Sequence, residues 1–467
     1  MRALKKTCIA ALLCYNALFT AQSASADLVA VSGEQTFITL KPMANGLSSV
    51  TLAWPLARLS AQKLLALRSG LVAVMGAGTE DLSPYEAKSH RSLNGLNFEV
   101  TSDGANLMLT ATSPTTTFPA LIAHLEDVLS TKDFPIERYK RELIRLQPQI
   151  VTKNRRPKDV MAVLAHNIAL PSEELDEPLE NFEFSFGRPK QVIMRSPDTA
   201  HKPLVETFLK DLPLRSSGAV AQLWRKLSLV EVATKLNQLE DPDFTLPKGV
   251  IHLNDPSSTE MMIVLVQAQT FEDEVAQVSA NLLMNYIGAH QGSEMFRIIR
   301  QELRAAYNPS SFFETAGKNK ALMALSATVA AEEWPELLEQ IKEIYENVRM
   351  GDISKAGLET VKDRLARRYS HSFATNPVWT AHNLLREYPI KVEGEIRLPV
   401  FSAVVEFDVA SIIDSPDEHL PLIEDYLVIL VGGGAEPSEE LRKNGYCALT
   451  PSQPLSHCLD VLKGAKP

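Results

Sequence analysis

Leu322–Val329 (LMALSATV) is the stretch that decides the fold, because a close copy of it stands about 215 positions earlier in the chain. That copy is Leu107–Thr112 (LMLTAT). Both stretches combine apolar positions with β-branched residues over a short run, a pattern typical of a buried or half-buried strand. Two such strands so far apart predict that one structural unit occurs twice.

The segments around the two strands repeat in the same order. A helix precedes each strand, and a second helix follows it with proline at its start, where the missing N–H would be unpaired anyway. A third helix comes next, and a strand is expected to begin each half. The first-half segments are Ser49–Trp54, the run ending in Val74–Ala77, Pro119–Leu129, Ile136–Leu146 and the phrase Ala165–Asn167; their counterparts are Met261–Gln267, the run ending in Asn285–Ala289, Pro335–Val348, Ile353–Ser370 and Ala381–Asn383. The sequence therefore predicts two copies of one α+β unit.

Four segments follow from this repeat and from composition. Residues 1–26 have the pattern of a signal peptide, and residues 27–237 form the first predicted domain. Residues 238–249 begin with the polar, turn-prone run QLEDPD and are predicted to be a linker. Residues 250–467 form the second predicted domain.

The N-terminal pattern predicts export. A basic head containing Arg2, Lys5 and Lys6 precedes a short apolar run, and Ala24–Ala26 provides the small-x-small site for cleavage after Ala26. The apolar run is too short to cross a membrane as a helix, and an uncleaved anchor is the less favoured interpretation. We therefore expect a periplasmic protein without a membrane span.

Charge argues against one class of partner. The whole chain carries 47 basic and 57 acidic side chains, and loss of the signal peptide leaves 44 and 57, a formal net charge of −13. Nucleic-acid binding needs clustered positive charge, so nucleic acid is not an expected partner.

Two cysteines remain after cleavage. Cys447 and Cys458 stand eleven positions apart, and an even number of cysteines in an oxidising compartment predicts a disulfide. Two buried thiols are the alternative.

The sequence contains no self-sufficient catalytic motif. None of the ten histidines has another within five positions, so no helical His-x-x-x-His zinc pair exists. No G-x-S-x-G elbow is present, and the glycines at 432–434 are interpreted as the turn after a final strand.

Ser293–Tyr307 (SEMFRIIRQELRAAY) is the most informative stretch for function. Met295, Phe296, Ile299 and Leu303 recur at helical spacing, so most of it is expected to be one amphipathic helix. Arg300 lies near the end of that helix, and Tyr307 lies just beyond it. By spacing alone, a solvated arginine and a packed tyrosine are the favoured interpretation, and a pair that binds a peptide carbonyl is the alternative.

This stretch and the repeat resemble the insulinase/pitrilysin family of zinc peptidases over essentially the whole mature chain. The spacing S-x-M-F-x3-R-x6-Y is similar to the family's second-half motif S-x-L-F-x3-R-x3-G-L-A-Y, with Arg304 and Ala305 in place of Gly-Leu. The resemblance implies two homologous α/β-roll domains, each an antiparallel sheet with helices packed on one face. It also implies that Arg300 and Tyr307 bind the substrate backbone.

The same resemblance places the family's zinc motif, an inverted H-x-x-E-H, in the first half. Aligned on Gly78 and Thr79, the two histidine positions are Ser69 and Ala73, the base position is Val72, and the third ligand falls at Gln149. Valine cannot accept a proton from water, alanine has no lone pair, and a neutral amide is a poor metal ligand. This chain is therefore expected to hold no metal.

This chain lacks the first-half zinc motif and has Arg300 and Tyr307. In both respects it resembles the non-catalytic member of the family's two-subunit enzymes. The expected partner is a chain that carries an intact H-x-x-E-H and binds zinc, and the expected substrates are peptides. A catalytically dead protein that binds peptides or scaffolds a complex is the alternative.

Overall fold

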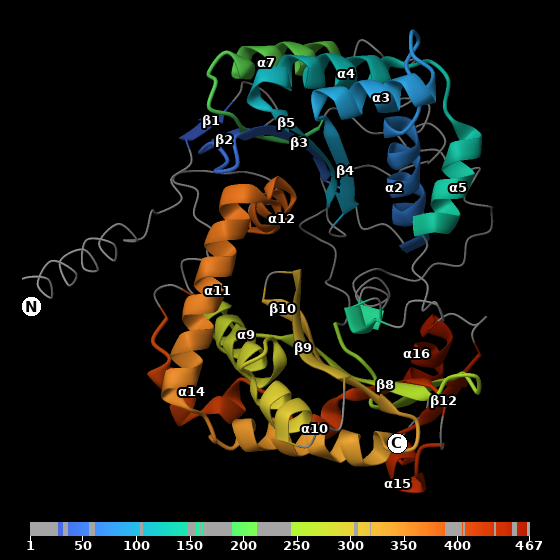
Figure 1. Ribbon diagram of the computed structural model, residues 1–467, viewed down its shortest axis with the longest axis vertical. Helices are drawn as coiled ribbons and strands as arrows, with labels where there is room; N and C mark the ends of the chain where they lie inside the picture. The colour runs from blue at the N-terminus through green and yellow to red at the C-terminus, as the bar shows by residue number, and fades with distance from the viewer. Residues whose placement is uncertain are drawn as a thin grey trace, which may run out of the picture.

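Each half of the sequence forms one mixed α/β layer structure built on a six-stranded sheet (Figure 1). The computed structural model describes residues 27–30, 36–55, 61–102, 106–146, 156–158, 160, 161, 164, 189–212, 244–302, 307–317, 319–387, 404, 407–433, 436–450 and 455–464. The two sheets and their helices confirm the α+β class.

The first sheet has the strand order β1-β2-β6-β3-β5-β4. Its strands are β1 (Asp27–Ala30), β2 (Thr36–Leu40), β3 (Leu47–Pro55), β4 (Asn97–Ser102), β5 (Asn106–Pro114) and β6 (Gln191–Arg195). The second sheet has the order β12-β7-β11-β8-β10-β9. Its strands are β7 (Gly249–Asn254), β8 (Glu260–Thr270), β9 (Tyr307–Gly317), β10 (Lys320–Ala330), β11 (Leu427–Gly432) and β12 (Tyr446–Leu449).

Five strands of each sheet have the same connectivity, so the sequence repeat is a structural repeat. The order β2-β6-β3-β5-β4 in the first sheet corresponds to β7-β11-β8-β10-β9 in the second. The repeated stretches Leu107–Thr112 and Leu322–Val329 lie in β5 and β10, the equivalent strands.

Three details of the expected sheets are wrong. The sheets are mixed, because β2 runs parallel to β6, and β7 runs parallel to both β11 and β12. Ser49–Trp54 and Met261–Gln267 do not begin the halves, since β2 and β7 precede them. The glycine turn at 432 is not the end of the final strand, because β12 follows. The strands β1, β2, β7 and β12 are too short for an alternation of apolar and polar residues to be recognised in the sequence.

The helices lie largely where the repeat predicts them. In the first half they are α2 (Ala61–Met75), α3 (Pro84–Asn94), η1 (Thr115–Thr117), α4 (Phe118–Ser130), α5 (Ile136–Leu146) and α7 (His201–Asp211). In the second half they are α9 (Glu274–Gly288), η4 (Phe296–Glu302), α10 (Trp334–Arg349), α11 (Lys355–Thr375), α12 (Pro377–Glu387), α14 (Ala410–Asp414), η5 (Pro416–Glu418), η6 (Ile423–Asp425), α15 (Glu439–Arg442) and α16 (Leu455–Gly464). No helix in the described ranges is long and apolar enough to span a membrane.

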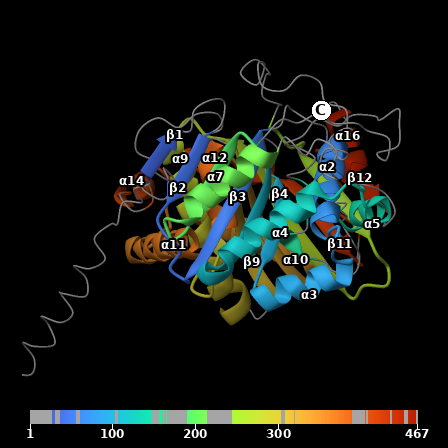
Figure 2. The same ribbon diagram turned by 90° about the horizontal axis from the view of Figure 1, so that it is seen from above.

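Helices cover both faces of each sheet, whereas the resemblance implied helices on one face only. In the view from above, α4 and α7 lie across the strands of the first sheet (Figure 2). The opposite face of that sheet buries Ile38, Met108 and Ile193 against Leu384 and Leu385 of α12, a helix of the second half.

The second sheet receives the reciprocal contact. Val160, Met161 and Leu164 of the first half pack with Met262 and Val264 of β8. These first-half residues precede the phrase Ala165–Asn167, which lies outside the described residues, and α12 contains the matching phrase Ala381–Asn383. Equivalent segments of the two halves therefore cover each other's sheets.

The end of α11 is also held by the first half. Its terminal carbonyls of Phe373, Ala374 and Thr375 accept hydrogen bonds from Arg195, from the backbone N–H of Ala44 (2.9 Å) and from the side chain of Asn45 (3.3 Å). The last carbonyls of a helix have no hydrogen-bond donor within the helix. Here the first half provides those donors.

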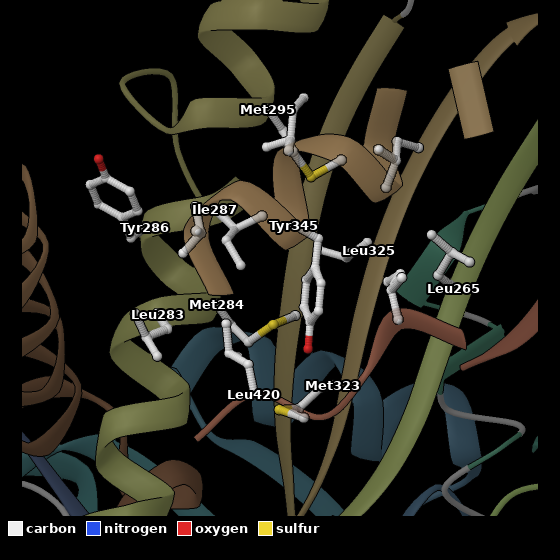
Figure 3. Close-up of a cluster of buried hydrophobic side chains, with 14 of the residues drawn as sticks. Leu265, Leu283, Met284, Tyr286, Ile287, Met295, Met323, Leu325, Tyr345 and Leu420 are labelled. Carbon is white, nitrogen blue, oxygen red and sulfur yellow. The ribbon is translucent and has the colours of Figure 1, made fainter. Parts of the chain in front are cut away.

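The larger core lies in the second half between β8, β10, α9 and α10 (Figure 3). Leu265, Met284, Met323 and Tyr345 are buried there, and Met295 enters the same cluster from the segment before η4. The predicted linker contributes to packing as well, because Phe244 and Leu246 are buried on the other side of this sheet. Both are apolar, so burial is favourable despite their position beside a polar run.

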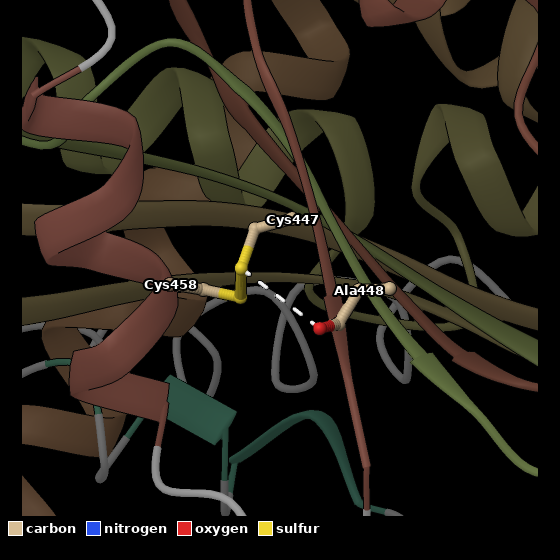
Figure 4. Close-up of a disulfide and its surroundings, with 3 residues drawn as sticks. All are labelled: Cys447, Ala448 and Cys458. Carbon is tan, nitrogen blue, oxygen red and sulfur yellow. Dashed lines mark hydrogen bonds between the residues drawn. A yellow bond between two sulfur atoms is a disulfide. The ribbon is translucent and has the colours of Figure 1, made fainter.

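Cys447 of β12 and Cys458 of α16 are joined by a disulfide (Figure 4). The bond ties the edge strand of the second sheet to the C-terminal helix across a sequence separation of 11.

Removing this disulfide is expected to lower the free energy of unfolding by roughly 3 kcal/mol, because a closed loop of this length restricts the unfolded chain by about that amount. The comparison is urea unfolding of the wild type and of Cys447→Ala/Cys458→Ala. Identical unfolding midpoints would contradict the prediction.

Candidate functional site

The segment that carries Arg300 is a π-helix anchored in the second core. Met295 and Ile299 are fully buried, whereas Arg300 is exposed on the other side. The sequence predicted an ordinary amphipathic helix; the structure instead has the wider π turn over Phe296–Glu302. Such turns are rare and occur frequently at functional sites.

Gly288 at the end of α9 allows this segment to sit close to β9. A Cβ at position 288 would lie 2.6 Å from the backbone nitrogen of Ser311 and 2.9 Å from the sulfur of Met295. Glycine is therefore required for the close approach, and the approach fixes where η4 begins.

Tyr307 is the first residue of β9 and lies at an irregular point of the sheet. Its backbone pairs with Thr328 across a register shift, and Asn308 follows it with a left-handed φ of 54°. Asparagine tolerates this conformation better than most residues. Irregularities of this kind bend a strand and redirect side chains next to active sites. Only the backbone of Tyr307 is described.

The Arg300 guanidinium lies over the ring of Phe296, 5.2 Å from its centroid. Exposed contacts of this type contribute about 0.5–1 kcal/mol, enough to bias the side chain toward one orientation. Arg300 therefore presents its donors to solvent from an anchored element that contacts β9.

The first-half positions share one face of α2. Ser69 and Ala73 are fully buried, and Val72 is half-buried. Ala73 packs within the apolar core of the first half, and the Ser69 hydroxyl has no hydrogen-bond partner in the part of the chain that the structure describes. Gln149 lies outside the described residues.

These residues do not fit a zinc ion. One buried hydroxyl, one methyl group and one isopropyl group provide neither the nitrogen and carboxylate ligands that zinc prefers nor a base. No group of three or more His, Cys, Asp or Glu side chains suited to a metal occurs in the described ranges. The face instead leads to a pocket that Val72 helps to line.

His124 of α4 stands near this pocket. Its buried ring stacks on His90, with centroids 5.7 Å apart, and lies 5.5 Å from the ring of Phe98. Burial lowers the pKa of His124 to about 4, and the charges of Arg91 and His90 act in the same direction. His124 is therefore neutral in the folded protein at pH 7.

Acid is expected to destabilise the protein through His124. Between pH 6.5 and about 4 the unfolded chain binds a proton at this residue and the folded chain does not. The free energy of unfolding therefore decreases as the pH is lowered, by about 3 kcal/mol at pH 4. In the variant His124→Phe this pH dependence of the free energy of unfolding should be absent. The variant His457→Phe, which changes an exposed histidine, should keep it. Parallel stability–pH curves for wild type and His124→Phe would contradict the assignment.

Sequence reasoning missed the buried arginine of the first half. Arg195, the last residue of β6, is 1% exposed and joins the two halves, as described above. No spacing rule marks it, because its partners Lys41 and Phe373 are distant in sequence. The arginines of the pocket beside Val72 were missed for the same reason.

Comparison with known proteins gives a family match for part of the chain and a fold for most of it. Residues 196–365 match the family model described as "Peptidase M16 inactive domain", a range that includes Arg300 and Tyr307. No curated protein matches the sequence significantly.

Solved structures match the chain over most of its length. The peptidase M16 inactive domain from Pseudomonas fluorescens is 13% identical with a TM-score of 0.61, and the match covers 89% of this chain and all of that one. A protease from Helicobacter pylori is 10% identical with a TM-score of 0.58, covering 88% of this chain and all of that one.

The periplasmic protease PqqL from Escherichia coli is 12% identical with a TM-score of 0.55, covering 89% of this chain, which spans only 46% of that longer protein. At these identities the structural matches establish the fold alone. The family match over residues 196–365 and the shared fold support an inactive-type member of the insulinase/pitrilysin (M16) peptidase family.

Proposed function

We propose that this protein is the non-catalytic subunit of a periplasmic, two-subunit zinc peptidase. In this proposal a separate chain with an intact H-x-x-E-H supplies zinc and the base, and this chain supplies Arg300 and Tyr307. Arg300 donates charge-assisted hydrogen bonds to a substrate carbonyl. Tyr307 donates a hydrogen bond to the oxygen on which negative charge develops.

One observation carries the proposal: the first-half positions cannot bind zinc, whereas the second half presents an exposed arginine. The first half has buried side chains at Ser69 and Ala73 that offer neither imidazole nor carboxylate, which supports placing the zinc on a partner chain. The second half keeps the arginine exposed on an anchored π-helix, followed by a strand that begins at Tyr307.

The periplasmic location rests on the N-terminal pattern and on the cysteine pair. The predicted cleavage site precedes Asp27, where the first described strand begins. A disulfide between Cys447 and Cys458 is the kind of bond that persists in an oxidising compartment.

The proposal is tested by co-expressing this chain with an H-x-x-E-H-bearing chain from the same host. Purified separately, neither chain should hydrolyse peptides efficiently; together they should form a complex that does. A chelator should abolish that activity and added zinc should restore it. A partner with glutamine at the position of its base serves as the matched inactive control.

Two outcomes would overturn it. A stable complex with no peptidase activity would favour the alternative of a peptide-binding or scaffolding protein. Hydrolysis by this chain alone would show that it has a catalytic site of another kind.

A further inference from the structure

A pocket of about 340 Å³ lies between α2, α3, α5 and β4 in the first half. These elements adjoin one another on one side of the first sheet (Figure 1). One wall is apolar and consists of Val72, Met75, Leu96, Phe98 and Val100. The volume is within the range of small-molecule sites and is sufficient for an organic group rather than a single ion.

The other wall is positively charged. Arg91 of α3 and Arg138 and Arg145 of α5 line it together with Glu142. Glu142 pairs with Arg145 at 2.5 Å, so its charge is already matched. Arg91 and Arg138 pair with no carboxylate within the described part of the chain. Two positive charges are therefore left facing the pocket.

The two unmatched guanidiniums lie close to each other. Burial lowers the pKa of Arg91, and the positive charge of Arg138 lowers it further. Arg138 lies against Gly76 so closely that a Cβ there would be 2.4 Å from Nη2. Like charges placed side by side repel, and a bound anion would remove that cost.

A purely structural role accounts for only one of them. Arg91 donates from Nη1 to the carbonyl of Met75 and so caps the end of α2. Arg138 does not do so: its Nε is buried and has no hydrogen-bond partner among the described residues. A buried donor without an acceptor is costly and calls for an explanation, and a bound ligand is one.

We propose that this pocket binds an organic carboxylate with an apolar group next to it, as at the free C-terminus of a peptide that ends in an apolar residue. Guanidinium groups bind carboxylates through paired hydrogen bonds, and the apolar wall would receive the neighbouring side chain. An inorganic anion would leave that wall exposed to water. The site requires neither the partner subunit nor Arg300 and Tyr307. It can therefore be tested independently of the proposed function.

The test is a binding titration of the full chain alone. The probe is a short peptide labelled at its N-terminus and ending in leucine with a free carboxylate; the comparison peptide is amidated at that end. The free acid should bind at least about 10-fold more tightly, and binding should weaken as salt is added. Equal affinity for acid and amide would overturn the proposal.

Arg138→Gln should weaken binding of the free acid by about 10-fold or more, because it removes the unpaired charge. Arg141→Gln is the matched control, since Arg141 is exposed on the same helix, donates to the carbonyl of Glu137 and does not line the pocket. Equal unfolding midpoints for the two variants would exclude a folding effect. An unchanged affinity in Arg138→Gln would overturn the site.

Competition identifies the source of the carboxylate. Displacement of the probe by octanoate as effectively as by unlabelled peptide would support the carboxylate chemistry and assign the site to small carboxylates. Weak displacement by octanoate would assign it to peptide ends. Displacement by inorganic phosphate as effectively as by the peptide would overturn the proposal, because the apolar wall would then contribute nothing.

Discussion

Tyr307→Phe is expected to lower the peptide-hydrolysis rate of the proposed two-subunit peptidase by about 10²–10³-fold. The substitution removes one hydroxyl donor from the developing oxyanion, and one such donor is typically worth about 2.7–4 kcal/mol of transition-state stabilisation. The ring is retained, so packing and assembly should be unchanged. The rate constant under saturating peptide is the quantity to measure, because the loss should appear there more than in KM.

Arg300→Ala should act on the same reaction, but partly through substrate binding, since the guanidinium would hold a ground-state carbonyl as well. Arg297→Ala is the matched control. Arg297 lies one turn away on the same π-helix, is exposed, and pairs with Glu294 at 2.5 Å. Exposed pairs contribute little to stability, so this variant should retain full activity. If Tyr307→Phe, Arg300→Ala and Arg297→Ala all gave the wild-type rate, the second-half pair would have no part in hydrolysis.

Arg195→Met is expected to lower the free energy of unfolding by roughly 2–6 kcal/mol, because it removes the donor from two carbonyls, those of Lys41 and Phe373, at about 1–3 kcal/mol each. Arg195 donates from Nε to the carbonyl of Lys41 at 2.9 Å and from Nη1 to the carbonyl of Phe373. Its guanidinium also lies 4.9 Å from the ring centroid of Phe373. Burial lowers the pKa of Arg195 to about 10, so it remains charged at neutral pH.

The loss should affect the contact between the halves more than either core. Urea unfolding followed by two probes, one in each half, should show a single transition in the wild type and separated transitions in Arg195→Met. Arg195→Lys should recover only part of the stability, because an ammonium group cannot reproduce the fork of the guanidinium. Lys210→Met, at an exposed position of α7, is the control. A wild-type midpoint for Arg195→Met would contradict the role assigned to this residue.

The repeated core elements could be predicted because their signals are local. Leu322–Val329 and Leu107–Thr112 alternate and branch as strands do, and the proline-led helices Phe118–Ser130 and Trp334–Arg349 begin within a residue of the predicted positions. The strands β2, β7 and β12 could not, because they are short and parallel pairing leaves no turn between the paired strands. The π turn at Phe296–Glu302 has nearly the same apolar spacing as an α-helix, so the sequence cannot distinguish the two.

The candidate site divides in the same way. The family resemblance locates Ser69, Val72, Ala73 and Arg300 in the sequence, and residue types alone then argue against zinc at Val72 and Ala73, since an isopropyl or methyl group cannot bind it. The pocket of Arg91 and Arg138 does not follow from them. These residues are 47 positions apart, and only the packing of α3 and α5 beside α2 brings their charges together.

The sequence by itself determined that the chain is a duplicated α+β unit and that Cys447 and Cys458 can pair. Composition and short-range periodicity are sufficient for those conclusions. Only the tertiary structure decided how the two copies are joined, through exchanged helices and the capped end of α11, and which arginines are buried or left unpaired. Such contacts depend on which distant surfaces meet, and burial and electrostatic energy arise only at that point.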